Sequence, residues 1–254
     1  MIPKVSIITV TYNCGDILEG TLKSIFEQSA KIYELIIIDG GSTDSTIRVI
    51  KKFEKSIAHW ISEPDNGIYD AMNKGIGLAK GDYLLFLNAG DSFNEIDTLE
   101  KIPFEKYPSA EIFYGETLIL GNEGEQLGLR RKKLPQNLTW KSFRRGMVVC
   151  HQSIFVKREI APFYDLQYKF AADVDWVIKS LKASKQIIFT KTIISNFTEG
   201  GFSNQNLIKS WLDRIHILNT HFGIFQCLLS HIFFIFDNVL LKLKIVPLFR
   251  TKYL

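Results

Sequence analysis

Cysteine is scarce in this chain, and its three copies are not spaced as disulfide or metal sites usually are. Cys14, Cys150 and Cys227 are odd in number and far apart. Small secreted domains that depend on disulfides carry many cysteines, and zinc sites need closely spaced ligands. Both classes are disfavoured, and a reducing, cytoplasmic compartment fits best.

Other signals are absent too. No basic segment precedes the first apolar run, so we expect no secretory signal. The first predicted strand is not followed by Gly-x-Gly-x-x-Gly, which disfavours a dehydrogenase, and the absence of Gly-x-x-x-x-Gly-Lys-Ser/Thr disfavours a P-loop enzyme. A net charge of only +4 gives little reason to expect a nucleic-acid partner.

The composition is that of an ordinary globular protein, with 46% hydrophobic and 23% charged residues. Apolar, β-branched runs alternate with segments of helical spacing through the first third of the chain. The predicted strands are 4–11, 35–38, 58–61 and 83–87, and the predicted helices are 17–28, 44–55 and 68–78. This order predicts an α/β fold with a parallel sheet covered by helices on both faces.

Later segments repeat the two patterns less regularly. Further strands are predicted at 111–120, 154–157, 187–190 and 193–197, with a helix at 173–183 and helical spacing from 207 onward. The chain is long enough for one large α/β domain with an appendage.

Polar residues stand where three of the strands end. Thr11 ends the first strand, Asp39 ends the second, and Asp91 follows the strand at 83–87. Parallel strands bring their carboxyl ends to one edge, where open α/β sheets bind ligands. One carboxylate there could accept a hydrogen bond from a nucleotide while another holds a divalent cation.

These motifs and the glycine-punctuated segment 62–76 resemble family 2 glycosyltransferases, inverting sugar transferases of the GT-A type. The subgroup most similar acts on bacterial surface polysaccharides, as the colanic acid glycosyltransferases do. The resemblance implies a GT-A catalytic domain over 1–205, with a donor half at about 1–98 and an acceptor half at about 99–205. A C-terminal amphipathic helical region, 206–254, would follow.

The resemblance also implies roles in donor binding. The base pocket would be lined by Thr11 and Tyr12, and Asp39 would bind the base unless it only serves the strand-to-helix turn. Asp65 would contact the sugar or base, and Lys74 would offset phosphate charge. The full donor-binding set is Thr11, Tyr12, Asp39, Asp65, Lys74 and Asn88. Many family members carry arginine where Met72 stands, and a purely structural helix is the alternative for this segment.

Asp91 would hold Mg²⁺ or Mn²⁺ against the donor diphosphate, although Asn88-Ala-Gly-Asp91 leaves only one of the usual two acids. Asp173 would be the catalytic base, with Ala172 in place of the family's glutamate. Asp175 is the rival base, but two residues along a helix it faces away from Asp173. A capping role is the alternative for both Asp91 and Asp173.

Two further motifs are predicted near the acceptor or a phosphate. His151 would bind the acceptor or orient a phosphate, unless it is a satisfied buried histidine. Gly200 and Gly201 would let backbone N–H groups approach a phosphate, unless they belong to a plain loop.

The tail from Phe222 to Leu254 combines apolar residues with a basic end. We expect it to lie peripherally in the membrane interface, or else to pack on the catalytic domain or in a homodimer. Polar residues disfavour a spanning helix; they are Gln226, Ser230, His231, Asp237 and Asn238.

Two functions are consistent with these motifs. The first is an inverting glycosyltransferase that moves a sugar from a nucleotide-sugar donor, UDP-sugar favoured, to a saccharide or lipid-linked acceptor. The second is a non-catalytic nucleotide-sugar-binding or scaffold protein of the same fold. The missing second metal acid and the missing glutamate before Asp173 motivate the second.

Overall fold

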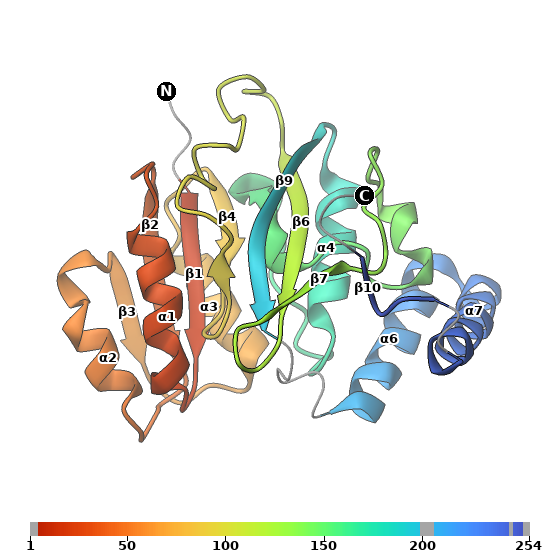
Figure 1. The fold of residues 1–254 in the computed structure, drawn as a ribbon, viewed down its shortest axis with the longest axis horizontal. Helices are drawn as coiled ribbons and strands as arrows, with labels where there is room; N and C mark the ends of the chain where they lie inside the picture. The colour runs from red at the N-terminus through yellow and green to blue at the C-terminus, as the bar shows by residue number, and fades with distance from the viewer. Residues whose placement is uncertain (1–4, 199–205, 244–245, 251–254) are drawn as a thin grey trace.

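The computed structural model describes residues 5–198, 206–243 and 246–250. One curled sheet runs through the molecule, with helices on both faces (Figure 1). The first half of the chain alternates strand and helix as predicted. Its elements are β1 Val5–Thr11, α1 Gly15–Phe26, β2 Tyr33–Asp39, α2 Thr46–Lys52, η1 Glu54–Ser56, β3 His59–Ser62, α3 Ile68–Leu78 and β4 Tyr83–Phe86.

These four strands are parallel, in the order β3-β2-β1-β4. β1, β4 and nearly all of β2 are buried, which accounts for their continuous apolar runs. The register pairs Thr11 with Asp39, and Asp39 with Ser62. Three polar strand ends therefore lie side by side at one edge.

The second half of the sheet is mostly antiparallel. Here β8 runs antiparallel to β4 and β6, while β9 runs parallel to β6. The bounds are β5 Ser92–Phe93, β6 Ile112–Leu120, β7 Gln126–Arg130, η2 Trp140–Arg145, η3 His151–Ser153, β8 Ile154–Lys157, η4 Arg158–Ile160, α4 Ala172–Ala183, β9 Ile187–Thr198 and β10 Phe249–Arg250.

One prediction in this half needs correction. The strands expected at 187–190 and 193–197 form a single strand, β9. Its pairing with β6 shifts register between Tyr114 and Thr117, and Lys191 has φ of 57°. An irregularity of this kind kinks a strand without ending it.

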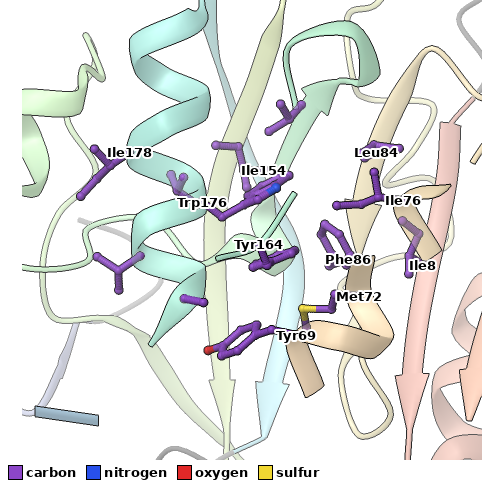
Figure 2. Close-up of a cluster of buried hydrophobic side chains, with 14 of the residues drawn as sticks. Ile8, Tyr69, Met72, Ile76, Leu84, Phe86, Ile154, Tyr164, Trp176 and Ile178 are labelled. Carbon is purple, nitrogen blue, oxygen red and sulfur yellow. The ribbon is translucent and has the colours of Figure 1, made fainter. Parts of the chain in front are cut away.

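Residues that alternate along the strands pack into two different hydrophobic cores. Ile8 and Phe86 face the core under α3 and α4, whereas Ile7 and Leu85 face the core under α1. In the first core Tyr164 lies between Tyr69 and Trp176, with ring centroids 5.3 Å apart on each side. Figure 2 shows this column beside Phe86. The column joins α3, from the donor half, to α4.

Two helices, α6 Leu207–Phe222 and α7 Ile224–Lys242, form a hairpin at the opposite end of the sheet from α2 (Figure 1). Gly223 separates them with φ of 79°, a value that favours glycine. The ring of Phe222 stacks on Trp140 of η2 at 5.3 Å. This contact holds the hairpin against η2.

The sequence disfavoured a membrane-spanning helix here, but α7 is long and apolar enough for one. Its window Ile224–Leu241 has a mean hydropathy of 1.8, and only 12% of it is buried. Cys227 and Ser230 are buried, and the Ser230 hydroxyl donates to the carbonyl of Arg144. These polar positions therefore face the protein and leave an apolar face outward.

Candidate functional site

Asp39 lies at the end of β2 and is fully buried. Its Oδ2 accepts hydrogen bonds from the N–H groups of Gly41 at 3.1 Å and Ser42 at 2.9 Å, and from the Ser62 hydroxyl at 2.7 Å. The Ser42 hydroxyl donates to Oδ1. The carboxylate thus holds the strand-to-helix turn, and a nucleotide base would have to share it. Next to it in the sheet, the buried Thr11 has its hydroxyl 2.8 Å from Cys14 Sγ.

Tyr12, Gly40 and Asp65 meet beside this turn. A Cβ on Gly40 would lie 2.7 Å from Asp65 Oδ2 and 3.3 Å from Cδ2 of Tyr12. Asp65 is fixed by the N–H of Gly67, 2.8 Å from its Oδ1, while Tyr12 is 64% exposed. The structure therefore brings two predicted donor residues, Tyr12 and Asp65, together beside Gly40, and we call this group the donor cradle.

Lys74 extends from α3 towards the same loop. Its ammonium lies 2.8 Å from Glu63 Oε1 and 3.2 Å from the carbonyl of Pro64. The hydrogen bond to Glu63 raises the pKa of Lys74. A donor phosphate would compete with Glu63 for this charge. On the same helix Met72 is fully buried in the core.

Asp91 follows β4 in a tight turn and is 6% exposed. Its Oδ2 accepts from Nε2 of Gln152 at 3.0 Å, and its carbonyl accepts from the Thr21 hydroxyl at 2.7 Å. Burial raises the pKa of Asp91 to about 7, although the hydrogen bond from Gln152 and the charge of His151 act in the other direction. The fold therefore places the Asp91 carboxylate where burial disfavours its charged form.

Asn88 supplies a second oxygen at this turn. Its Oδ1 is buried and has no hydrogen-bond partner among the described residues, while its Nδ2 lies 3.4 Å from Nε2 of His151. No group of three His, Cys, Asp or Glu side chains in the described chain is arranged to hold a metal. Asp91 and Asn88 still fit Mg²⁺ or Mn²⁺, because such ions prefer oxygen ligands and complete their shell with waters and substrate phosphates.

Asp173 lies in the first turn of α4, where the backbone cap is Ala171 and no side chain caps the helix. Its Oδ1 accepts from the Tyr69 hydroxyl at 3.2 Å, and its Oδ2 lies 3.6 Å from Nδ1 of His151. Burial alone would raise the pKa of Asp173, but the nearby His151 and the charge of Arg214 hold it below its usual value. These charges favour the carboxylate form of Asp173.

Asp175, the rival base, faces away from this site. It is almost fully buried, with Oδ2 2.8 Å from Nζ of Lys179 and Oδ1 2.6 Å from Nε2 of His221. Its carboxylate ties α4 to α6. These contacts agree with the expectation that the two aspartates cannot both point at one hydroxyl.

The turn η3 connects Asp173, the predicted base, to the turn that holds Asn88 and Asp91. His151 lies between Asn88 and Asp173, and Gln152 holds Asp91. The resemblance placed His151 near the acceptor, but Gln152 and Tyr69 were not assigned contacts with the two aspartates. The Tyr69 contact spans 104 positions of the chain, so no local sequence pattern could have indicated it. The predicted phosphate-loop residues Gly200 and Gly201 lie outside the described residues.

Residues 6–159 match the family model described as glycosyl transferase family 2. The chain belongs to this family. The PGL/p-HBAD biosynthesis glycosyltransferase of Mycobacterium bovis is 33% identical to this family 2 chain over 87% of each. TuaG of Bacillus subtilis, named for teichuronic acid biosynthesis, is 30% identical over 62% of this chain and 63% of its own.

Solved structures confirm the GT-A fold of this glycosyltransferase. TarS of S. aureus in complex with UDP-GlcNAc has a TM-score of 0.62 at 18% identity, covering 79% of this chain and 60% of that one. The mannosyltransferase PcManGT of Pyrobaculum calidifontis, in complex with GDP-Man and Mn²⁺, has a TM-score of 0.61 at 16% identity. That match covers 85% of this chain and 64% of that one.

Proposed function

We propose that this glycosyltransferase moves a hexose from a nucleotide-sugar donor, with UDP-sugar favoured, to a saccharide or lipid-linked acceptor with inversion. The pathway would be bacterial cell-surface polysaccharide synthesis, in keeping with the name of TuaG. One observation carries the proposal: His151 and Gln152 lie between Asp173 and the Asn88–Asp91 turn and contact both. This arrangement would hold a base and an oxygen-rich cation site together.

The reaction would be a single displacement. Asp173 would remove the proton of the acceptor hydroxyl as that oxygen attacks the anomeric carbon, while the bond to the nucleoside diphosphate breaks. Tyr69 and His151 would orient the carboxylate of Asp173. Asp91 and Asn88 would hold a divalent cation, which supplies charge neutralisation for the departing diphosphate.

The non-catalytic alternative keeps two observations in its favour. Asp91 is the one carboxylate of the metal motif, and Ala172 stands where the family carries glutamate. Both proposals predict donor binding, but a scaffold protein would transfer sugar to no acceptor. Detection of transfer would exclude the scaffold.

The donor is the first thing to test. Purified protein is mixed with UDP, GDP, dTDP or NAD, each with and without Mn²⁺, and its melting temperature is measured. We expect UDP to raise it in a Mn²⁺-dependent way, because a ligand that binds only the folded state stabilises that state by mass action. A shift with GDP or dTDP in place of UDP would show that the donor carries a different nucleobase. No shift with any nucleoside diphosphate would contradict a donor site.

We also propose that α7 contacts the membrane surface. Its outward residues are large and apolar at helical spacing, among them Leu228, Ile232 and Phe236, each about 60% exposed. A monomeric soluble protein rarely exposes so large a continuous apolar face. An interfacial helix would place the enzyme beside amphiphilic acceptors.

This contact is tested by sedimentation with vesicles of phosphatidylcholine and phosphatidylglycerol. Leu228→Ser/Ile232→Ser should weaken vesicle binding by roughly tenfold or more, because burying one such side chain is worth about 1.5–3 kcal/mol. The matched control Ile96→Ser/Phe163→Ser removes equally exposed apolar residues elsewhere and should bind as wild type does. Equal binding of both variants would exclude α7 as the membrane contact.

A further inference from the structure

A basic pocket lies between the sheet and the α6–α7 hairpin, apart from the donor cradle. It has a volume of about 350 Å³, which is within the range of small-ligand sites. No Asp or Glu of the described chain lines it. Its cationic lining residues are Arg130, Arg131, Lys132, Arg145 and Arg214.

Two of the residues that line the pocket stand close in the chain to residues that contact the proposed site. Val174, one of its lining residues, follows Asp173 on α4. Phe197, another, precedes Thr198, whose hydroxyl donates to the carbonyl of Gly90 beside Asp91 at 3.0 Å. A ligand in the basic pocket would therefore lie next to the base without entering the donor cradle.

Arg214 lines the pocket and acts on Asp173 through its charge. Its charge helps to hold the pKa of Asp173 low, and its buried Nε has no hydrogen-bond partner among the described residues. A buried guanidinium donor without a partner is rare in folded proteins. An anionic oxygen in the pocket would satisfy it, and arginine suits phosphate oxygens especially well.

The other walls of the pocket are apolar or aromatic. Trp211, Phe234 and Leu248 line it, and the outward apolar face of α7 continues from there. A second cavity of about 570 Å³ shares Lys132, Arg145, Ser230 and Phe234 with the first. The combination of clustered cations with an apolar exit suits an amphiphilic phosphate ester.

We propose that the basic pocket binds the phosphate or diphosphate group of an amphiphilic acceptor, whose apolar chain leaves over Trp211 and Phe234 towards α7. This inference rests on the proposed function, because it names the acceptor class of that reaction. The bound phosphate would hold the acceptor so that a hydroxyl of its sugar reaches Asp173.

The test is calorimetric titration of the full chain in EDTA with farnesyl diphosphate, farnesol, inorganic pyrophosphate and dihexanoyl phosphatidylglycerol. We expect farnesyl diphosphate to bind at least roughly tenfold more tightly than any of the other three, because it alone offers both a diphosphate and an apolar chain. Equal affinity for pyrophosphate would show a simple anion site. Equal affinity for phosphatidylglycerol would show a headgroup site. Either result would overturn the acceptor assignment.

Variants test whether farnesyl diphosphate binds in the basic pocket. Arg131→Gln/Arg145→Gln should weaken farnesyl diphosphate binding by roughly tenfold or more, because it removes two charges that line the pocket. Arg131→Lys/Arg145→Lys keeps the charge and should retain most of the affinity. Arg48→Gln/Lys55→Gln removes two exposed charges at the opposite end of the sheet and should bind as wild type does. Unchanged binding in Arg131→Gln/Arg145→Gln would overturn the proposal.

The two proposals can fail separately. Arg131→Gln/Arg145→Gln should keep the Mn²⁺-dependent shift with UDP, whereas Asp91→Ala should lose that shift and still bind farnesyl diphosphate. A wild-type protein that binds farnesyl diphosphate but no nucleotide would contradict the donor proposal and support the pocket. The reverse pattern would contradict the pocket alone.

Discussion

Asp173→Asn is expected to slow sugar transfer by roughly 10²- to 10⁴-fold, the usual contribution of a positioned general base. Asparagine keeps the shape of the side chain and can still accept the hydrogen bond from Tyr69, so the fold should persist. The measurement is turnover of the nucleotide sugar named by the melting screen. UDP should still raise the melting temperature of the variant, because Asp173 is not a proposed donor contact.

Asp175→Asn is the matched control for this change. It removes a carboxylate two residues away on the same helix, whose partners are Lys179 and His221. We expect a lower melting temperature, because a nearly buried pair is broken, with turnover of the folded enzyme changed far less. If Asp173→Asn turned over normally and Asp175→Asn did not, the base would be Asp175.

The second large effect is expected from Asp91→Ala. UDP should no longer raise the melting temperature of this variant in a Mn²⁺-dependent way. Its turnover should fall by roughly a hundredfold or more, because a bound cation stabilises the leaving group by several kcal/mol. The melting temperature and the turnover are each measured with and without Mn²⁺ at a fixed nucleotide concentration.

Asp97→Ala provides the comparison for Asp91→Ala. Asp97 lies six residues further along the chain, in an ion pair with Lys101 on the surface. Its removal should leave both the Mn²⁺ response and turnover close to wild type, since exposed pairs contribute little. A Mn²⁺ response that survived in Asp91→Ala would place the cation elsewhere or show that none is used.

The donor half of the fold could be predicted from the sequence because each of its signals is local. The apolar run before Asp39 and the helical spacing before Gly81 each mark one element, and strict alternation then dictates a parallel sheet. The observed pairing of Thr11 with Asp39 follows from that regularity. The GT-A resemblance, too, rested on these local motifs.

The second half could not be derived in this way. β5 and β10 are two residues long, and β7 is half exposed, so none of them leaves a clear periodic pattern. The link from His151 to Asp173, and that from Gln152 to Asp91, are long-range contacts made only when the sheet is assembled. The basic pocket likewise joins residues from β7, η2, α6 and α7.

The reversal of strand direction at β8 has a consequence for where such enzymes carry their polar residues. Because β8 is antiparallel to β4, the residues that reach the ligand edge stand before β8, whereas those of the first half stand after their strands. His151 and Gln152 occupy that upstream position. In proteins with this kind of sheet, a search for site residues in the second half should therefore look ahead of each reversed strand.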